Sequence, residues 1–366
     1  MKIAYIVEPR RVIGGGVRAA INLSKSMNNL YGETTIVFGV YKGALADKDV
    51  HIQEVSTLKP ISFGYWRSLG KFINSYKPDI VHCLGLYTAL LSIIYKKITH
   101  KKFSIVCTVH RVTMNLRFRK SLKYIIGFIA KNLNYTTFLT SYQQEHYFKN
   151  IGFRPNKYAI IPNVIYIQQA SNIEIQQTRN KLTTALNTDF LTSYVGRIIP
   201  SKNLEDFIRI IALANRQGVN IGGVLVGGYD TAYYNKLQNI IKKESIANKI
   251  IFTGYVNNPT VYTAATDFTT TTTHGEALPN LLIESFASGK ITISSNIPQM
   301  TDLITNGENG FTIPLTDLSK FVNAIILIHT NTEQRKKMES SALSTYKTYY
   351  NPTNVADKYH QIYITL

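Results

Sequence analysis

Glu276 and Glu284 lie in one short stretch, THGEALPNLLIESFASG (residues 273–289), that could hold a ligand around the start of a helix. The β-branched run before them (267–273) is typical of a strand, and Pro279 favours the first position of a helix. Unpaired N–H groups and the positive end of the helix dipole suit a phosphate there. Carboxylates beside a phosphate usually hold hydroxyl groups, so the stretch favours a sugar nucleotide. A surface helix with two ordinary glutamates is the alternative.

Arg197 and Lys202 supply the cations that such an anion needs. They lie in VGRIIPSKN (residues 195–203), which is typical of the end of a strand, a loop and the start of a helix. An arginine can clamp a diphosphate with its planar fork, and a lysine can add a point charge. The spacing alone is weak evidence, because Arg-x4-Lys arises by chance in any basic protein.

A glycine triplet at 14–16 offers a second place for a phosphate. With Ala19 it satisfies G-x-G-x-x-A, the dinucleotide-binding pattern, at the start of a predicted helix. However, residues 9–13 separate the triplet from the strand 2–8, and Tyr41 and the lysine after it follow the second strand where an NAD site needs an acidic residue. The triplet therefore favours close approach to a ligand held by another domain over binding of NAD.

Alternating strand and helix patterns predict two halves, each a parallel, doubly wound α/β sheet. The predicted strands of the first half are 2–8, 35–40, 51–55, 79–82, 103–109, 135–140 and 158–161, with helices such as 66–76 and 86–97 between them. Those of the second half are 190–195, 221–226, 249–253, 267–273 and 291–294. The polar segment 168–187 breaks this rhythm. We therefore predict an N-terminal domain (1–168), a C-terminal domain (188–348) and a final helix (349–366) that returns to the first domain, with the ligand between the two domains.

The composition is that of a folded protein. The 366 residues allow two domains with sizeable cores, and 45% are hydrophobic while 17% are charged. No stretch approaches the roughly 18 uncharged apolar residues that span a bilayer. The first apolar run is too short for a signal peptide, so we expect a cytoplasmic protein. Cys83 and Cys107 end predicted buried strands, and we expect both to be reduced core thiols.

The formal net charge of +19 favours anionic partners, although a Lys-, Asn- and Ile-rich bias explains it equally well. The segment 116–132, LRFRKSLKYIIGFIAKN, has the pattern of a basic amphipathic helix that could lie on an anionic membrane surface. A core-facing helix with solvated lysines is the alternative. No helix-turn-helix, zinc-finger, RRM or KH signature accompanies the charge, so we expect no nucleic-acid partner. The cations of the segment are Arg117, Arg119, Lys120, Lys123 and Lys131.

Taken together, these stretches resemble the retaining GT-B glycosyltransferases of family four. The order and spacing of the motifs fit over nearly the whole chain, which is more specific than any single motif. The resemblance implies two facing Rossmann-like domains, with the nucleotide sugar held mainly by the C-terminal one. The matching stretches are the triplet at 14–16, KPDIVHCLG (77–85), TVH (108–110), IPNV (161–164), VGRIIPSKN (195–203), the two glutamates of E-x7-E, and NGENGF (306–311).

The resemblance also implies roles for particular residues. Arg197 and Lys202 would bind the donor diphosphate, together with backbone N–H groups at Leu278, Pro279, Asn280, Leu281 and Leu282. Glu284 would bind the ribose, Glu276 the transferred sugar, and His110 the far edge of that sugar or the acceptor. Gly15 and Gly16 would let the N-terminal domain approach the phosphates. The family needs no metal and no separate cofactor, because the nucleoside diphosphate sugar is a substrate and these cations neutralise its leaving group.

The same resemblance implies a hexosyltransferase that builds bacterial surface polysaccharide, such as O-antigen, capsule or lipopolysaccharide. Its acceptor would be a glycan on a polyprenyl carrier, reached from the inner face of the plasma membrane. A front-face mechanism is favoured over double displacement, which would require Glu276 as the nucleophile.

Two positions depart from the family pattern. Ala277 stands where a glycine is common, and PQMTD (298–302) stands where Gly-Gly-x-Pro-Glu is common, so that only Asp302 can keep a carboxylate there. Other functions stay open on the same fold, namely a nucleotide-sugar epimerase and a soluble storage-glucan synthase. A non-catalytic module that binds an anionic polymer is a third alternative, against which the intact Arg197, Lys202, Glu276 and Glu284 argue.

Overall fold

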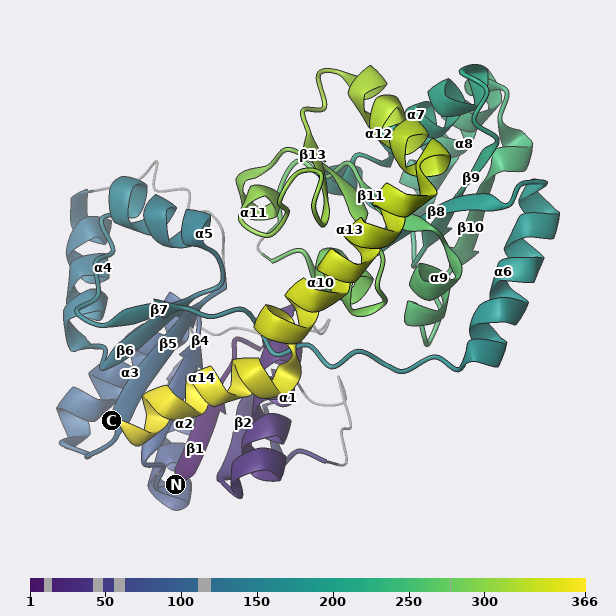
Figure 1. Cartoon of the computed structure of the whole chain (residues 1–366). Helices are drawn as coiled ribbons and strands as arrows, with labels where there is room; N and C mark the ends of the chain where they lie inside the picture. Colours follow the sequence, from purple (N-terminus) through teal and green to yellow (C-terminus); the bar gives the residue numbers. More distant parts are fainter. Residues whose placement is uncertain (10–14, 42–48, 56–62, 111–119, 277) are drawn as a thin grey trace. The chain divides into compact units, whose positions relative to one another are not determined.

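A computed structural model describes residues 1–9, 15–41, 49–55, 63–110, 120–276 and 278–366. The chain forms two compact units (Figure 1), one made of Met1–Tyr166 and Tyr350–Leu366 and the other of Ile167–Tyr349. Each unit contains one parallel β-sheet with helices on both faces, which confirms the predicted fold class. Within the described part of the chain, no helix combines the length and apolarity needed to cross a bilayer.

Seven described strands form the sheet of the first unit, in the order β3-β2-β1-β4-β5-β6-β7, and every pair is parallel. Their sequences are rich in β-branched residues and almost continuously buried in the middle of the sheet, as expected for strands covered on both faces. The strands are β1 (Lys2–Ile6), β2 (Thr34–Tyr41), β3 (Ile52–Val55), β4 (Ile80–Leu84), β5 (Ser104–Val109), β6 (Tyr135–Phe138) and β7 (Tyr158–Ile160).

Helices cover the two faces of this sheet with separate hydrophobic cores. On one face, α2 (Phe63–Tyr76), α3 (Leu86–Thr99) and α4 (Lys120–Asn132) pack on alternate strand residues. On the other face, α1 (Gly15–Tyr31) packs beside α14 (Pro352–Ile364), which confirms that the final helix returns to the first unit (Figure 1). The short α5 (Ser141–His146) continues into a π-helical turn, Tyr147–Ile151. Cys83 and Cys107 are buried free thiols, as predicted.

Six described strands form the sheet of the second unit, in the order β10-β9-β8-β11-β12-β13, again all parallel. Sequence patterns predict five of them, but not β13, which has only four residues and follows a polar turn. The strands are β8 (Phe190–Val195), β9 (Ile221–Val226), β10 (Ile250–Gly254), β11 (Phe268–Thr271), β12 (Thr292–Ser295) and β13 (Gly310–Ile313).

Helices also cover both faces of the second sheet. The helices α7 (Leu204–Arg216), α8 (Thr231–Glu244) and α12 (Leu318–Thr330) pack on one face. On the other side of the sheet, α6 (Asn172–Leu186) packs against residues of β8 and β9. The remaining elements are α9 (Thr260–Ala265), α10 (Asn280–Ala287), α11 (Pro298–Thr301), α13 (Thr332–Thr345), the 3₁₀ turns Pro200–Lys202 and Ala247–Lys249, and a π-helical turn, Tyr346–Tyr350.

The α6 helix corrects one expectation, because the segment 168–187 is not merely a polar connection. Ser171 and Glu174 form a capping box that begins the helix, and Arg179 ties it to the second unit. The Arg179 guanidinium donates hydrogen bonds to the Asp267 carboxylate and to the carbonyls of Ala265 and Asp189. The helix looks like a linker in sequence because its exposed face is polar and its buried side chains are few.

Candidate active site

The sheet of the second unit reverses its strand order between β8 and β11, which are neighbours although β9 and β10 separate them in sequence. Ligands of open α/β sheets bind beyond the carboxyl ends of the strands at such a point. The loop after β8 carries Arg197 and Lys202, and the loop after β11 carries Glu276 and leads into α10 with Glu284. The fold therefore brings the four residues singled out in the sequence to the same edge of one sheet.

Lys202 and Glu276 form an ion pair across the two loops. Lys202 is the last residue of the 3₁₀ turn Pro200–Lys202, and Glu276 lies four residues before α10 begins. Their side chains are 15% and 25% exposed, so the pair is shielded but reachable from solvent. This contact joins the predicted diphosphate-binding lysine to the predicted sugar-binding carboxylate.

Arg197 lies on the surface of the same loop, and its carbonyl accepts a 3.3 Å hydrogen bond from the Tyr194 hydroxyl. Burial raises the pKa of the Tyr194 phenol, the Glu276 charge raises it further, and the Arg197 charge opposes both. Tyr194 therefore lies within electrostatic reach of a predicted cation and a predicted carboxylate. Gly227 packs so closely on the loop that a Cβ atom there would clash with the carbonyl oxygen of Gly196.

Two of the five backbone positions predicted to bind the diphosphate at the start of α10 have no N–H group available for it. Pro279 immediately precedes the first helical residue, Asn280, whereas the sequence suggested that the proline itself begins the helix. A proline has no N–H group, and the N–H of Leu282 already donates to the Pro279 carbonyl at 3.1 Å. The candidate donors to an anion are thus Leu278, Asn280 and Leu281.

Glu284 is partly buried and lies about one turn into the helix. Ala277 lies outside the described residues.

His110 follows β5 in the first unit, next to the start of α1. A Cβ atom on Gly16 would lie 3.8 Å from the His110 ring, an ordinary contact, whereas one on Gly15 would meet nothing within 4 Å. Gly16 therefore lies beside the predicted catalytic histidine, and Gly15 is exposed. The first glycine of the triplet lies outside the described residues.

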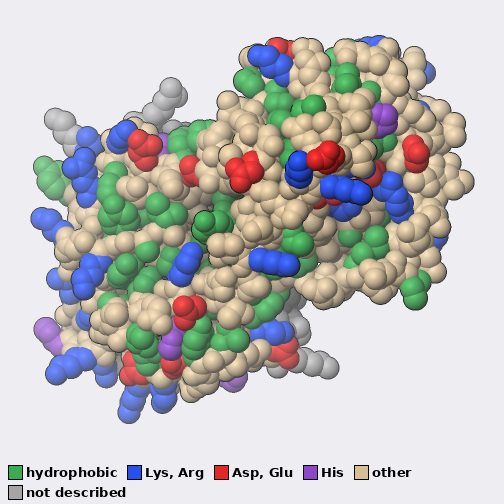
Figure 2. Space-filling view, in the orientation of Figure 1, with side chains coloured by type: hydrophobic (Ala, Val, Ile, Leu, Met, Phe, Trp, Pro, Cys, Tyr) green, Lys and Arg blue, Asp and Glu red, His purple; other side chains and the backbone are tan. Residues whose placement is uncertain are grey.

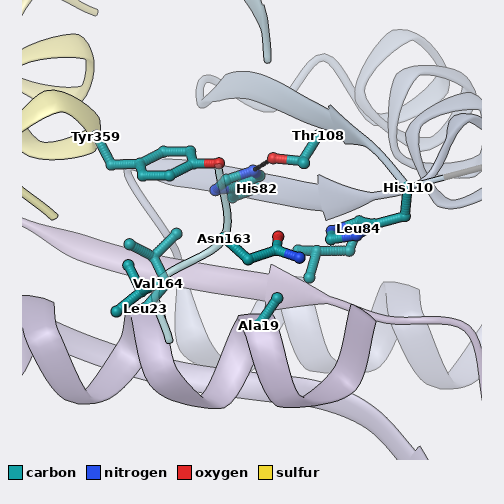
Figure 3. A pocket seen from close by; sticks show the side chains of 9 residues that line it. All are labelled: Ala19, Leu23, His82, Leu84, Thr108, His110, Asn163, Val164 and Tyr359. Atoms are coloured by element: carbon teal, nitrogen blue, oxygen red, sulfur yellow. Dashed lines mark hydrogen bonds between the residues drawn. The ribbon is translucent and has the colours of Figure 1, made fainter. Parts of the chain in front are cut away.

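A small pocket adjoins His110 within the first unit (Figure 3). Figure 3 shows the Asn163 side chain pointing into it on the side of His110 and Leu84. Asn163 is part of the IPNV motif, but the motif alone does not predict that Asn163 lines a pocket. An asparagine in an apolar stretch directly after a strand was the available signal. The lining residues are Ala19, Leu23, His82, Leu84, Thr108, His110, Asn163, Val164 and Tyr359.

A chain of buried polar groups lies behind this pocket. His82 Nδ1 is 2.6 Å from the Tyr363 hydroxyl, His82 Nε2 is 2.7 Å from Thr108 Oγ1, and Thr108 Oγ1 is 2.6 Å from Thr137 Oγ1. Burial lowers the pKa of His82 to about 3 and the pKa of His110 to about 4. Both imidazoles are therefore neutral at pH 7, so each ring has one N–H donor, one acceptor nitrogen and no positive charge.

The departure at 298–302 contains the short helix α11, which ends directly before Asp302, the residue at the position of the glutamate in Gly-Gly-x-Pro-Glu. Gln299 is buried, whereas Asp302 is exposed at the end of the helix. A carboxylate is thus present near the expected sequence position, on the surface of the second unit.

Solved structures with the same architecture identify the fold as GT-B. The structure of HepE from Anabaena in complex with UDP aligns over 100% of both chains with a TM-score of 0.85 at 16% identity. A glycosyltransferase from Rickettsia africae aligns over 99% of this chain and 98% of its own, with a TM-score of 0.82 at 18% identity.

Sequence comparison places the chain in a family. The model described as Glycosyl transferases group 1 matches residues 175–345, and the model described as Glycosyltransferase Family 4 matches residues 13–169. The chain therefore belongs to the group 1 glycosyltransferases of family 4, as its motifs suggested.

Several relatives are named for the synthesis of bacterial surface polysaccharides. A UDP-Gal:alpha-D-GlcNAc-diphosphoundecaprenol alpha-1,3-galactosyltransferase from Escherichia coli is 25% identical over 82% of this chain and 78% of its own length. The O-antigen biosynthesis glycosyltransferase WclY from Escherichia coli is 20% identical over 100% of this chain and 99% of its own. The capsular polysaccharide glycosyltransferase CapM from Staphylococcus aureus is 25% identical over 43% and 40%.

Proposed function

We propose that this glycosyltransferase moves a hexose from a nucleoside diphosphate to a glycan hydroxyl during synthesis of a bacterial surface polysaccharide, with retention of anomeric configuration and without a metal ion. The observation that carries the proposal is the Lys202–Glu276 pair at the strand-order reversal, beside the N-terminus of α10. Solved relatives in complex with UDP and UDP-glucose support a nucleotide-sugar donor. The names of the sequence relatives support the polysaccharide.

In the proposed reaction, the bond between the anomeric carbon and the diphosphate oxygen breaks while the acceptor oxygen bonds to the same face of that carbon. The acceptor proton passes to the departing phosphate oxygen. Arg197, Lys202 and the open N–H groups of α10 stabilise the negative charge that develops on the diphosphate. Glu276 accepts hydrogen bonds from the transferred sugar, Glu284 from the ribose, and neutral His110 bonds a sugar or acceptor hydroxyl.

A panel of nucleoside diphosphate sugars tests this function. Each donor would be mixed with the protein, and donor hydrolysis and the rise in melting temperature would be measured for the same set. We expect one donor to give both signals, with NMR showing a first-formed sugar product of the same anomeric configuration as the donor. An inverted product would contradict retention. Interconversion of the donor sugar without its release would instead indicate an epimerase.

The α4 helix supports a proposal about where the reaction occurs. Ile126, Ile129 and Ala130 pack in the core, so the core-facing interpretation holds for one side of the helix. The opposite side exposes Tyr124 (81%) and Phe128 (37%), which lie one helical turn apart. Apolar side chains that are exposed together can mark a contact with a partner or a membrane. Lys97 of α3 lies over the Phe128 ring, 5.6 Å from its centroid.

Tyr124, Phe128 and Lys97 belong to a surface that combines basic and apolar side chains, which we call the α4 surface. Figure 2 shows Lys and Arg side chains gathered along the edge of the first unit where α3 and α4 lie. Such a mixture suits anionic lipid headgroups with an apolar layer beneath. We propose that the α4 surface contacts the cytoplasmic leaflet, which would give access to a polyprenyl-linked acceptor. The α4 surface consists of Lys97, Ile98, Lys123, Tyr124, Ile125, Phe128 and Lys131.

A further inference from the structure

The two loops of the candidate site are tied together by hydroxyl groups that play no part in the proposed reaction. Thr272 and Thr273 directly follow β11 and are fully buried. Their side chains do not bond within their own sheet. They point to the loop after β8, in which Lys202 lies.

Each hydroxyl bonds a different part of that loop. Thr272 Oγ1 donates to the Asn203 carbonyl at 2.7 Å, with the Lys202 carbonyl at 3.4 Å. Thr273 Oγ1 lies 3.3 Å from the Ser201 carbonyl and 3.1 Å from the Gly275 carbonyl. A hydroxyl has a single hydrogen, so Thr273 can donate to only one of these two carbonyls, whereas Thr272 donates to the carbonyl of Asn203, directly after Lys202.

Thr273 also shapes its own loop. Besides facing the Gly275 carbonyl, its Oγ1 accepts a 3.4 Å hydrogen bond from the Gly275 N–H, one residue before Glu276. Its own carbonyl accepts a 2.6 Å hydrogen bond from the Ser295 hydroxyl at the end of β12. The Thr273 hydroxyl therefore contacts its own loop and lies within hydrogen-bond distance of the loop that carries Lys202, while Ser295 at the end of β12 holds the Thr273 backbone.

We propose that Thr272 and Thr273 are positioning residues for donor chemistry: their hydroxyls set the separation between Lys202 and Glu276. The inference rests on the proposed function, because the ion pair matters only if its two side chains meet a donor. A shift of about 1 Å in a positioned group can reduce a rate by about a hundredfold, so loss of either tie is expected to be visible in kinetics.

Removal of the hydroxyls with little change in shape provides the test. Thr272→Val and Thr273→Val delete the donors, whereas Thr272→Ser and Thr273→Ser keep them. The matched control is Thr270→Val in β11, the strand that these two residues follow. The Thr270 hydroxyl is equally buried, but its hydrogen-bond partner is the Thr192 hydroxyl inside the sheet, at 2.9 Å. For each variant we would measure the melting temperature, kcat and KM with the donor that the wild-type protein accepts, and Kd for UDP.

We expect each Val variant at 272 or 273 to lose about tenfold or more in kcat/KM, more than it loses in affinity for UDP, with recovery in the Ser variant. Thr270→Val should lower the melting temperature by a similar amount and change kcat/KM less than about twofold. A crystal structure of Thr272→Val should show the Lys202–Glu276 pair separated. The proposal is overturned if kcat/KM of the Thr270 and Thr272 variants falls in proportion to stability, or if the pair is unchanged. A wild-type protein inactive on every donor would instead contradict the proposed function.

Discussion

His82 of β4 and Tyr363 of α14 share a buried hydrogen bond of 2.6 Å, although 281 positions separate them in the chain. The bond joins the centre of the first sheet to the last helix, and the other nitrogen of the same ring contacts Thr108 of β5. The Tyr5 and Tyr359 rings lie 5.5 and 5.7 Å from the His82 ring, centroid to centroid. The helix α14 is therefore held on the first sheet by a buried hydrogen bond that is surrounded by aromatic rings.

Tyr363→Phe should destabilise the protein by about 1–3 kcal/mol, because it leaves His82 Nδ1 buried without its partner. The free energy of unfolding would be measured by urea titration. Tyr255→Phe is the control, since its ring is 78% exposed and its change should stay within about 0.5 kcal/mol. Equal effects of the two substitutions would show that the His82–Tyr363 bond contributes nothing.

Stability should fall in acid because His82 is buried in its neutral form. Burial lowers its folded-state pKa to about 3, whereas an unfolded histidine has a pKa of about 6.5. Between these values the unfolded chain binds a proton that the folded chain excludes, so stability decreases as the pH falls from about 6.5 towards 3. This one group contributes at most about 1.4 kcal/mol per pH unit.

Urea titrations between pH 7 and 4 would measure this dependence in the wild-type protein and in His82→Gln. The variant should be less stable at pH 7 and should lose less stability on acidification. His51→Gln, at an exposed position, should keep the wild-type dependence. Parallel curves for the wild-type protein and His82→Gln would refute the assignment.

Arg197→Ala and Lys202→Ala should each reduce kcat/KM by about a hundredfold or more, because each removes charge that stabilises the departing diphosphate. The fold should be kept, as judged by circular dichroism. Arg209→Ala is a matched control, because Arg209 is exposed on α7 and pairs with Asp206 in its own helix. Near-normal turnover in both site variants would remove these residues from the donor site.

Activity should survive EDTA, because the proposed leaving group meets Arg197, Lys202 and the start of α10 in place of a metal ion. Turnover would be measured on the accepted donor before and after chelation, and after addition of magnesium or manganese. Loss of activity with EDTA and recovery with either ion would contradict the metal-free mechanism.

Binding to vesicles should depend on anionic lipid and weaken with salt, since exposed charges are screened. Replacement of Arg117, Arg119, Lys120 and Lys123 by Gln should release the protein from anionic vesicles and spare donor hydrolysis. The side chains of the first three lie outside the described residues. Flotation with anionic and neutral vesicles would measure binding, and replacement of Lys242, Lys243, Lys336 and Lys337 in the second unit serves as a charge-matched control. Equal binding to neutral and anionic vesicles would contradict the proposed membrane contact and leave α4 as a helix that only packs on the core.

Local patterns were sufficient for most strands, because β-branched runs and their spacing reflect burial directly. Local patterns did not predict elements that depend on a contact distant in sequence, or elements that are very short. The α6 helix depends on Arg179 reaching Asp267, 88 positions away, and β13 is short and adjoins a glycine-containing turn. Its strand character comes from pairing with β12, which no local pattern contains.

The roles of the candidate site residues stay predictions, and the sequence points to some of these residues more clearly than to others. Its charged residues carry motifs that survive in sequence, whereas Thr272 and Asn163 resemble ordinary strand and loop residues. Thr272 gains its significance from a carbonyl 69 positions earlier, and Asn163 from the fold of the first unit around His110. The α4 helix has a clear sequence pattern, but that pattern fits both a core-facing helix and a membrane-binding helix. In the structure one side of α4 packs in the core and the other side exposes aromatic residues.

The ion pair between Lys202 and Glu276 also has a consequence for selectivity among anions. The Glu276 carboxylate matches the Lys202 charge in this structure, so an inorganic phosphate or sulfate ion that binds Lys202 must displace Glu276. Such an ion offers the displaced carboxylate no positive charge and few hydrogen-bond donors. A nucleotide sugar carries hydroxyl groups that can donate hydrogen bonds to the displaced Glu276 carboxylate, while its phosphates form ion pairs with Lys202. The pair would thus discriminate against the abundant small anions of the cell, and inorganic phosphate should inhibit Glu276→Gln more strongly than it inhibits the wild-type enzyme.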